Sequence, residues 1–599
     1  MNERLNWLGL ANKFALAGDP QGMRACAREL FDLNQKSADG PAVMAEAALY
    51  NNSLEEAENL ARDALLLDPE HLRARMVLGG LAAQKFELKE ELSLLQGVVD
   101  EIHAFLRKQE EDRKRLHGRL QMTIRPETAA QHQRTRELED AEERVLRYLL
   151  FRSLGWLADG RYLAGDPIAA AEALQEASGI AQDREIAAEL YSKHLFLRNY
   201  RELAPSAGRE LAEKYQSFVA DVTPYSVQGK GGSPDKKLRI GYISPDFRQH
   251  AVANFMLPLF RDFDDENFSV YCYSIGRSDA VTERLRRHHV LWRDVHSRPP
   301  RSVARMVAED QIDILVDLSG HSQGNALAVM AAHAASVQIC ALGYTATTGL
   351  RAMDYFLSDV TCLPEHEKNV AFTEKIMRLK HCHLCYAPGL VREMPQAGIQ
   401  APFFRNGYVT YGCFNNFAKV SDDVLYCWRA IMEQVPEAHL VLKSKICSIP
   451  SGRAIVMERL SKISFPVERV ELRPYSPDYL EQYRDIDIAL DTMPYNGGLT
   501  TCEALYMGVP VVTLRGRSHG ARFGASILKN GDLAELVAET PMEYIKKAVQ
   551  LGKRVELIAG YHSGLREHLQ KSALMDSKQY MRELEACYRE AWKACSAVK

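Results

Sequence analysis

The hydrophobic period of this chain changes once, near residue 222, and that change constrains the fold more than any other feature. Up to residue 222, Ala and Leu recur at three- and four-residue steps with hardly any β-branched alternation, which predicts amphipathic helices. After residue 238, short apolar runs alternate with helical stretches, as in a parallel sheet covered by helices on both faces. The sequence therefore predicts an all-α region followed by an α/β region.

The helical region resembles tetratricopeptide hairpins in places. Residues 54–69 carry small side chains at Ala57 and Ala64, where neighbouring helices must approach closely, and then end at a proline. The register of about 34 residues is not sustained, so we expect degenerate, repeat-like helical hairpins. Between residues 101 and 149, charges of both signs are mixed, which favours a solvated long helix or helical hairpin over an arm that binds nucleic acid or a partner.

Glycine and proline mark the expected boundaries between domains. They are dense in residues 223–237 and interrupt both helix and strand there. A second cluster of prolines, near residues 387–407, divides the α/β region into two lobes. We expect a helical domain at 1–222, a linker at 223–237, a first lobe at 238–400, a second lobe at 401–575 and a terminal helix at 576–599.

Composition excludes several classes of protein. Of 599 residues, 46% are hydrophobic and 26% charged, which excludes a disordered or collagen-like chain. Lys and Arg total 75 against 79 acidic residues, a net charge of -4, so no nucleic acid partner is expected and any phosphate site must be local. Neither a secretion signal nor a run of about 20 apolar residues occurs, and the cysteines sit mainly in apolar runs. We therefore expect a cytoplasmic protein with no membrane span.

A Gly- and Thr-rich turn in residues 491–513 carries the clearest chemical signal. A strand ends at Asp491, the turn follows, and a helix then runs to Gly508-Val509-Pro510. Backbone N–H groups and hydroxyls at such a helix N-terminus suit a diphosphate, and a carboxylate in the first turn of the helix can accept from ribose hydroxyls. An ordinary βα loop with a capping threonine has the same pattern. The candidate donor-binding residues are Gly497, Gly498, Thr500, Thr501 and Glu503.

This segment closely resembles the nucleotide-sugar loop of glycosyltransferase family 41, which contains the protein O-GlcNAc transferases and related bacterial protein glycosyltransferases. The resemblance covers about residues 238–590 and includes three further motifs, at 238–250, 314–349 and 411–419. It implies a GT-B catalytic region of two doubly wound, Rossmann-like lobes behind the helical repeats. The first lobe would face the acceptor, the second would bind a UDP-sugar, and the site would lie between them.

The resemblance also assigns roles to individual residues. Lys419 would neutralise charge on the leaving diphosphate, supported by Asn416 on the same turn. His250 would lie beside the sugar, orienting the acceptor or assisting proton removal, and Asp279 is a further carboxylate that fits a solvated loop better. Tyr479 stands where relatives commonly stack a histidine on uracil, and Gln482, one turn later, is either a donor contact or a solvated helix residue. The catalytic candidates are thus His250 and Lys419.

No metal ligand set is expected in this sequence. The run His381-Cys382-His383-Leu384-Cys385 lacks a second ligand pair at zinc-finger spacing. Asp264-Asp265-Glu266 is a polar turn, and Asp485-Ile486-Asp487 is embedded in a strand. By resemblance, Lys419 and a helix N-terminus replace the metal, so the UDP-sugar is a co-substrate and no cofactor is required.

These observations predict a protein glycosyltransferase that moves a hexose or N-acetylhexosamine from a UDP-sugar to protein side chains with inversion. A nucleotide-sugar epimerase and a non-catalytic helical-repeat scaffold with decayed lobes are the alternatives. The helical domain would recognise the acceptor or form a homo-oligomer, and relatives suggest flagellin or a surface adhesin as acceptor. The sequence leaves open which sugar is transferred, and whether to a Ser/Thr oxygen or an Asn nitrogen.

Overall fold

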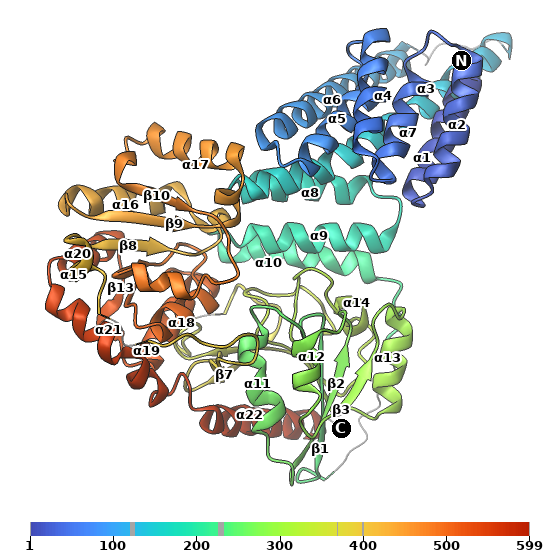
Figure 1. The fold of residues 1–599 in the computed structure, drawn as a ribbon. Coiled ribbons are helices and arrows are strands. Elements are labelled where there is room, and N and C mark those ends of the chain that lie inside the picture. Colours follow the sequence, from blue (N-terminus) through green and yellow to red (C-terminus); the bar gives the residue numbers. More distant parts are fainter. Residues whose placement is uncertain (1, 120–125, 226–232, 368, 398–399, 598–599) are drawn as a thin grey trace. The chain divides into compact units, whose positions relative to one another are not determined.

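The computed structural model describes residues 2–119, 126–225, 233–367, 369–397 and 400–597 (Figure 1). The chain forms two compact units. One comprises Met1–Ala187 with Ile449–Ala454, and the other comprises Ala188–Ser448 with Ile455–Lys599. Among the described residues, no helix has the length and apolar character needed to cross a membrane.

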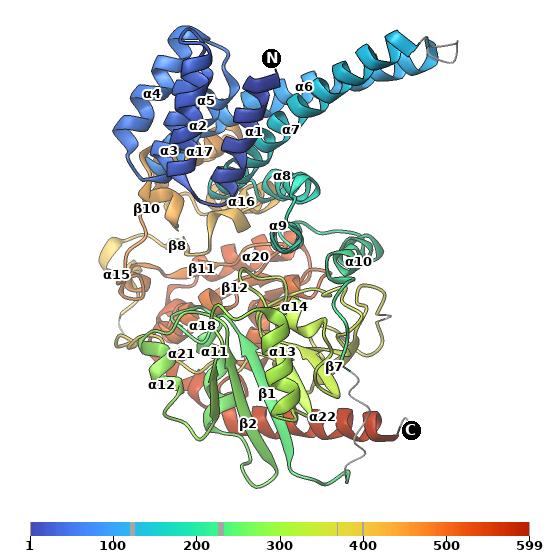
Figure 2. The same cartoon turned by 90° about the vertical axis from the view of Figure 1, so that its right-hand side faces the viewer.

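The first unit is built of helices that pack against their neighbours along the chain (Figure 2). Asp19 and Asp166 cap α2 and α8 through main-chain N–H groups, and a proline follows each cap. Small residues allow close packing: a Cβ on Gly80 would lie 2.8 Å from the Trp156 ring. The helices are α1 (Asn2–Leu16), α2 (Pro20–Leu33), α3 (Asp39–Tyr50), α4 (Leu54–Leu67), α5 (Leu72–Gln84), α6 (Leu88–Arg119), α7 (Pro126–Leu163) and α8 (Pro167–Ile180).

The charged stretch at 101–149 is a pair of long helices, as expected. It falls on α6 and α7, which lie side by side in Figure 2. Arg113 of α6 pairs with Asp140 and Glu143 of α7, both at 3.0 Å. Exposed pairs of this kind are worth about 0–1 kcal/mol each, so the stretch is a solvated helical pair. Residues 120–125, between the two helices, lie outside the described residues.

The second unit contains two parallel sheets, as the alternating pattern predicts. The first has the order β3-β2-β1-β4-β5-β6-β7 and the second β10-β9-β8-β11-β12-β13. The first sheet consists of β1 (Leu238–Ser244), β2 (Phe268–Ser274), β3 (Leu291–Asp294), β4 (Ile314–Asp317), β5 (Val337–Cys340), β6 (Tyr355–Asp359) and β7 (Lys375–Leu379). The second consists of β8 (Thr410–Cys413), β9 (His439–Lys443), β10 (Val470–Arg473), β11 (Ile488–Leu490), β12 (Val511–Leu514) and β13 (Val537–Ala538).

Helices precede the first sheet and cover both sheets, and the central strands are buried between them. Ile240 of β1, for example, lies opposite Val270 of β2 and Ile314 of β4. The helices are α9 (Arg184–Arg198), α10 (Pro205–Glu213), α11 (Ala253–Arg261), α12 (Ala280–Leu285), α13 (Pro300–Glu309), α14 (Leu327–Met330), α15 (Phe403–Asn406), α16 (Asp422–Gln434), α17 (Pro450–Lys462), α18 (Leu499–Tyr506), α19 (Phe523–Asn530), α20 (Pro541–Gly552), α21 (Val555–Gln570) and α22 (Ser577–Ala597).

The last helix, α22, returns from the second lobe to the first. In Figure 1 its red ribbon lies beside the green helix α11. Tyr580, Leu584 and Tyr588 follow helical spacing and bury one face of α22. Glu583 accepts a hydrogen bond from the main-chain N–H of Lys380, just after β7. The terminal helix therefore connects the two lobes of the catalytic unit.

The expected domain boundaries stay predictions. Within the proposed linker at 223–237, residues 226–232 lie outside the described part of the chain, and residues 398–399 do so beside the proposed lobe boundary at 400. The helical segment before the linker ends with a 3₁₀ turn, η1 (Lys214–Val219), and β1 starts at Leu238.

Candidate active site

A cleft of about 880 Å³ lies at the carboxyl ends of the parallel strands of both lobes. The strand order reverses at β1 in the first sheet, where β2 lies on one side and β4 on the other, and at β8 in the second sheet, where β9 and β11 do so. Open α/β sheets bind ligands at such a reversal. The loop after β1 brings His250 to the cleft, and the loop after β8 brings Asn416 and Lys419. The start of α18 completes the wall with Gly498 and Thr500.

The turn before α18 is held by a buried carboxylate. Asp491 accepts hydrogen bonds from the main-chain N–H groups of Thr492 (2.8 Å) and Gly497 (2.7 Å) and from the Thr513 hydroxyl (2.7 Å). Burial raises the pKa of Asp491 to about 6 against these hydrogen bonds. A Cβ on Gly497 would meet the Thr500 hydroxyl at 2.5 Å. Glycine is therefore required here for the turn to close on the helix.

The threonines of this turn are already hydrogen-bonded within the protein. The Thr501 hydroxyl donates to the Gly497 carbonyl at 2.9 Å, and the Thr500 hydroxyl donates to the Asn415 side chain at 2.7 Å. Thr501 and Gly497 shape the loop from behind the wall, whereas Gly498 and Thr500 line the cleft. The groups that this turn could offer to an anion are thus mainly main-chain N–H groups at the N-terminus of α18.

Lys419 lies beside this turn with its ammonium group fixed at two points. Its Nζ donates to the Asn496 carbonyl at 3.0 Å and lies 4.2 Å from the centroid of the Tyr495 ring. Burial lowers the pKa of Lys419 to about 8, against the opposing charge of Asp491. Asn416 begins the 3₁₀ turn η2 (Phe417–Lys419), and its side chain accepts from the Ala418 N–H at 3.1 Å. Sequence reasoning thus correctly placed Asn416 and Lys419 on one turn.

Tyr479 and Glu503 form a second part of the wall. The Tyr479 hydroxyl donates to the Glu503 carboxylate, which is 3% exposed. Burial raises the pKa of Glu503 to about 7. Arg392, from the segment between the lobes, lies 4.7 Å from the centroid of the Tyr479 ring. An aromatic ring and a carboxylate therefore adjoin each other at the edge of the cleft.

His250 faces the cleft from the first lobe and has a buried acidic neighbour. Its Nδ1 lies 3.5 Å from the Asp246 carboxylate, and the His250 side chain is 38% exposed whereas that of Asp246 is 4% exposed. Burial lowers the pKa of His250, and the Asp246 charge opposes that effect. Asp279 accepts from the Gln249 N–H at 2.7 Å and caps α12. Asp279 also lines the cleft, and its interpretation as a loop residue stays a prediction.

Two groups of residues differ from the sequence-based assignment. Gln482 is not one of the described residues that line the cleft. Its amide donates to the Ser476 hydroxyl at 2.8 Å instead. Sequence reasoning missed several basic residues. Lys443 could have been recognised as a candidate, because it ends an apolar strand on the ligand-binding edge of the sheet. The missed basic residues that line the cleft are Arg248, Arg392, Lys443 and Lys445.

Two doubly wound lobes with a cleft at the carboxyl ends of their strands define a catalytic region of GT-B type. The model of glycosyl transferase family 41 matches residues 209–387 and 400–584. The chain belongs to this family, as its motifs predicted.

The matched relatives include plant proteins and one bacterial structure. A tomato (Solanum lycopersicum) protein named "Probable UDP-N-acetylglucosamine--peptide N-acetylglucosaminyltransferase SPINDLY" is 38% identical over 370 residues, which are 60% of this chain and 39% of that protein. Its Arabidopsis thaliana namesake is 37% identical over 60% of this chain and 40% of its own length. The chain therefore spans about two fifths of these plant relatives. A solved O-GlcNAc transferase mutant from Thermobaculum terrenum superposes with a TM-score of 0.72 at 29% identity, covering 94% of this chain and 98% of that one. This likeness confirms the order of helical repeats before a two-lobed catalytic region.

Proposed function

We propose that this protein transfers a hexose or N-acetylhexosamine from a UDP-sugar to side chains of a protein acceptor, with inversion at the anomeric carbon. The observation that carries the proposal is the fixed position of Lys419 Nζ, 3.0 Å from the Asn496 carbonyl in the turn that starts α18. A compact cation beside helix N–H groups stabilises a departing diphosphate. Family membership and the names of the relatives support the same reaction.

In the proposed reaction, an acceptor oxygen or nitrogen attacks the anomeric carbon from the face opposite UDP. The bond from that carbon to the diphosphate oxygen breaks, and its electron pair leaves with UDP, so the configuration inverts. Lys419 and the N–H groups of α18 stabilise the negative charge that appears on the diphosphate. The cleft holds acceptor and donor in line, which lowers the entropic part of the barrier.

The acceptor side is assigned to His250. Its imidazole lies in the cleft wall and is the group in position to orient the acceptor and receive its proton. The neighbouring Asp246 carboxylate favours the protonated imidazole that such a step would form. This pair is the first-lobe contribution to the site.

The donor side is assigned to the second lobe. Tyr479 offers an aromatic surface for the base, and Glu503, which it contacts, is placed for the ribose. Asn416, Gly498 and Thr500 flank the diphosphate in the cleft wall, while Gly497, Thr501 and Gln482 hold the surrounding loops in position.

The test is to incubate the full chain with separate UDP-hexoses and UDP-N-acetylhexosamines, and with GDP-sugars as controls, in the presence of host-cell proteins. Mass added to proteins from a UDP-sugar, and lost in Lys419→Ala, is the expected result. Epimerised free nucleotide sugar would establish the epimerase alternative instead. Folded protein that yields neither product would favour the scaffold alternative, and transfer from GDP-sugars alone would refute the uridine assignment.

Further partners are proposed on the same basis. The helical unit would recognise the acceptor, with flagellin or a surface adhesin as the first proteins to assay, or would mediate self-association measurable by light scattering. The reaction would proceed with no metal in the cleft, so transfer is expected to persist in EDTA. A cytoplasmic location is supported by cysteines that are mostly buried as single apolar side chains.

A further inference from the structure

A second cluster of reactive side chains lies outside the cleft, where the two lobes of the catalytic unit adjoin. Cys362 follows β6 and His383 follows β7 in the first lobe, whereas His519 follows β12 in the second. One ligand atom from each of these three residues lies within 4.8 Å of the other two. All three side chains are buried, with residue exposures of 0%, 1% and 3%.

Three imidazole nitrogens in this cluster have no hydrogen-bond partner among the described residues: Nε2 of His383 and both ring nitrogens of His519. A buried polar atom without a partner costs about 1–3 kcal/mol. A metal ion binds the lone pair of a neutral imidazole nitrogen, so these unpartnered nitrogens are candidate ligand atoms.

The Asp359 carboxylate holds His383 in a ligand-like orientation. His383 Nδ1 lies 2.5 Å from Asp359 Oδ2, so Nδ1 carries the proton and the lone pair of Nε2 is left for another partner. Histidine ligands of metals commonly donate their second N–H to a carboxylate in this way. The other Asp359 oxygen accepts from the Thr361 and Cys362 N–H groups at 2.9 and 2.8 Å, which also fixes the Cys362 main chain.

The surroundings of the cluster suit a structural metal. The rings of Phe356, Phe372 and Phe523 pack around His519 with centroids 5.1 to 6.2 Å away. Arg522 is a nearby cation, whose guanidinium donates to the Cys362 carbonyl at 3.0 Å and is neutralised by Glu367 at 2.8 Å. Aromatic rings, the Asp359 carboxylate and a guanidinium that is already paired thus surround the cluster.

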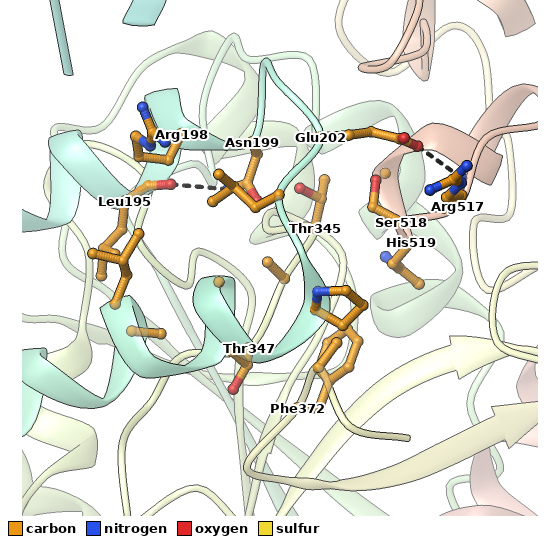
Figure 3. A pocket seen from close by; sticks show the side chains of 18 of the residues that line it. Leu195, Arg198, Asn199, Glu202, Thr345, Thr347, Phe372, Arg517, Ser518 and His519 are labelled. Carbon is orange, nitrogen blue, oxygen red and sulfur yellow. Dashed lines mark hydrogen bonds between the residues drawn. The ribbon is translucent and has the colours of Figure 1, made fainter. Parts of the chain in front are cut away.

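One residue of the cluster, His519, also borders a pocket, which Figure 3 shows from close by. His519 lies on the wall of a pocket of about 570 Å³, together with Ser518, Thr345 and Phe372. The pocket lies within the second compact unit. Cys362 and His383 are not among its described lining residues, so His519 is the part of the cluster that borders it.

We propose that Cys362, His383 and His519 bind one Zn²⁺ and so join the two lobes. A thiolate with two neutral imidazoles is a ligand set that zinc prefers. On binding, the Cys362 thiol loses its proton to solvent, and the sulfur and the two ring nitrogens each donate an electron pair to the ion. The ion takes one of the unpartnered nitrogens of each histidine as a ligand.

The histidines and cysteines of residues 381–385 do not by themselves predict this site. In the run 381–385, His381 pairs with Glu583 of α22 at 2.5 Å, and Cys385 is buried in the apolar core. The remaining ligands come from the turns after β6 and β12, which only the folded topology brings to His383. The site is independent of the transfer chemistry, because none of its ligands lines the catalytic cleft.

The test is the metal content of the full chain, purified without chelator from zinc-supplemented cells. We expect about one zinc per chain, falling at least fivefold in Cys362→Ser, His383→Phe and His519→Gln. The matched control is Cys447→Ser, because Cys447 is buried and hydrogen-bonded to a carbonyl but lies outside the cluster. It should retain the zinc.

X-ray absorption at the zinc edge of the unmodified protein decides the question if a variant fails to fold. At least one sulfur at about 2.3 Å and nitrogen ligands at about 2.0 Å are expected. Three results would overturn the proposal. The first is a content below about a tenth of a zinc per chain, the second is full zinc content in folded ligand variants, and the third is a zinc coordination shell of oxygen alone.

Discussion

Replacing Lys419 with methionine removes one positive charge from the cleft while keeping a side chain of similar length. The lost group is an ammonium held 3.0 Å from the Asn496 carbonyl and 4.2 Å from the Tyr495 ring centroid. We expect kcat/KM for transfer to fall by about 10²- to 10³-fold, because removing one preorganised charge or donor at a developing anion costs roughly 3–4 kcal/mol.

The stability of the fold should change far less. The pKa of Lys419 is lowered from 10.5 to about 8, so the unfolded chain binds this proton more tightly, and stability rises as pH increases from 8 to 10.5. Below pH 8 the burial cost is fully present, about 2 kcal/mol after allowance for partial contact with solvent. Methionine removes that cost but loses a hydrogen bond worth about 1 kcal/mol and a cation–π contact worth about 0.5–1 kcal/mol. The stability gained from removing the burial cost and the stability lost with these two contacts therefore nearly cancel.

The assay therefore combines initial transfer rates, UDP binding by calorimetry and urea unfolding at pH 7.5. Lys445→Met is the comparison, because Lys445 lines the same cleft but is exposed, and a screened charge should cost less than tenfold. A Lys419→Met protein that transfers at more than a tenth of the normal rate would refute the reasoning. So would a loss of activity that tracks a large loss of stability.

Three other changes test the site. Gly497→Ala places a Cβ 2.5 Å from a threonine hydroxyl, so UDP affinity should fall at least tenfold by calorimetry; unchanged affinity would show that the turn tolerates the methyl group. Tyr479→Phe removes the hydroxyl that donates to Glu503. Because the pKa of Glu503 is about 7, urea unfolding should show a loss of about 1–2 kcal/mol at pH 8 and less at pH 5.5, and equal losses would contradict this. Asp246→Asn removes the charge that raises the pKa of His250, so the acidic limb of the kcat/KM profile should move to lower pH; a limb that stays in place would separate Asp246 from catalysis.

The strands in the middle of each sheet are easier to recognise in the sequence than most of the strands at the edges. Central strands such as β1 and β4 are buried on both faces and appear as continuous apolar runs. Strand β3 lies at an edge, and its Leu291 is 49% exposed, so it has no such run. Strand β7 also lies at an edge and alternates Lys375 and Arg378 with apolar residues. Edge strands bury one face, so their pattern in the sequence is weaker.

Some residues of the candidate site can be recognised from a local sequence motif, whereas others come together only in the fold. Asn416 and Lys419 occur in one short motif, and the structure places both in the cleft wall. Arg392 reaches the Tyr479 ring from the segment between the lobes, and no local pattern ties it to that ring. Asp246 precedes His250 by four residues, but a strand-end acid is common, and its burial beside the imidazole depends on the fold.

The charge distribution of the cleft is compatible with the anionic donor proposed above, although the chain has a net charge of -4. Basic residues outnumber the carboxylates in the wall, and Glu503 has a pKa of about 7, so it is not fully ionised at neutral pH. Helix N–H groups add further positive potential at α18. Low-dielectric walls concentrate this local potential, whereas the acidic excess elsewhere is screened within about 8–10 Å. The charges concerned are Arg248, Arg392, Lys419, Lys443 and Lys445 against Asp279 and Glu503. An anion site in this protein therefore depends on the placement of a few lysines and arginines, which net charge does not report.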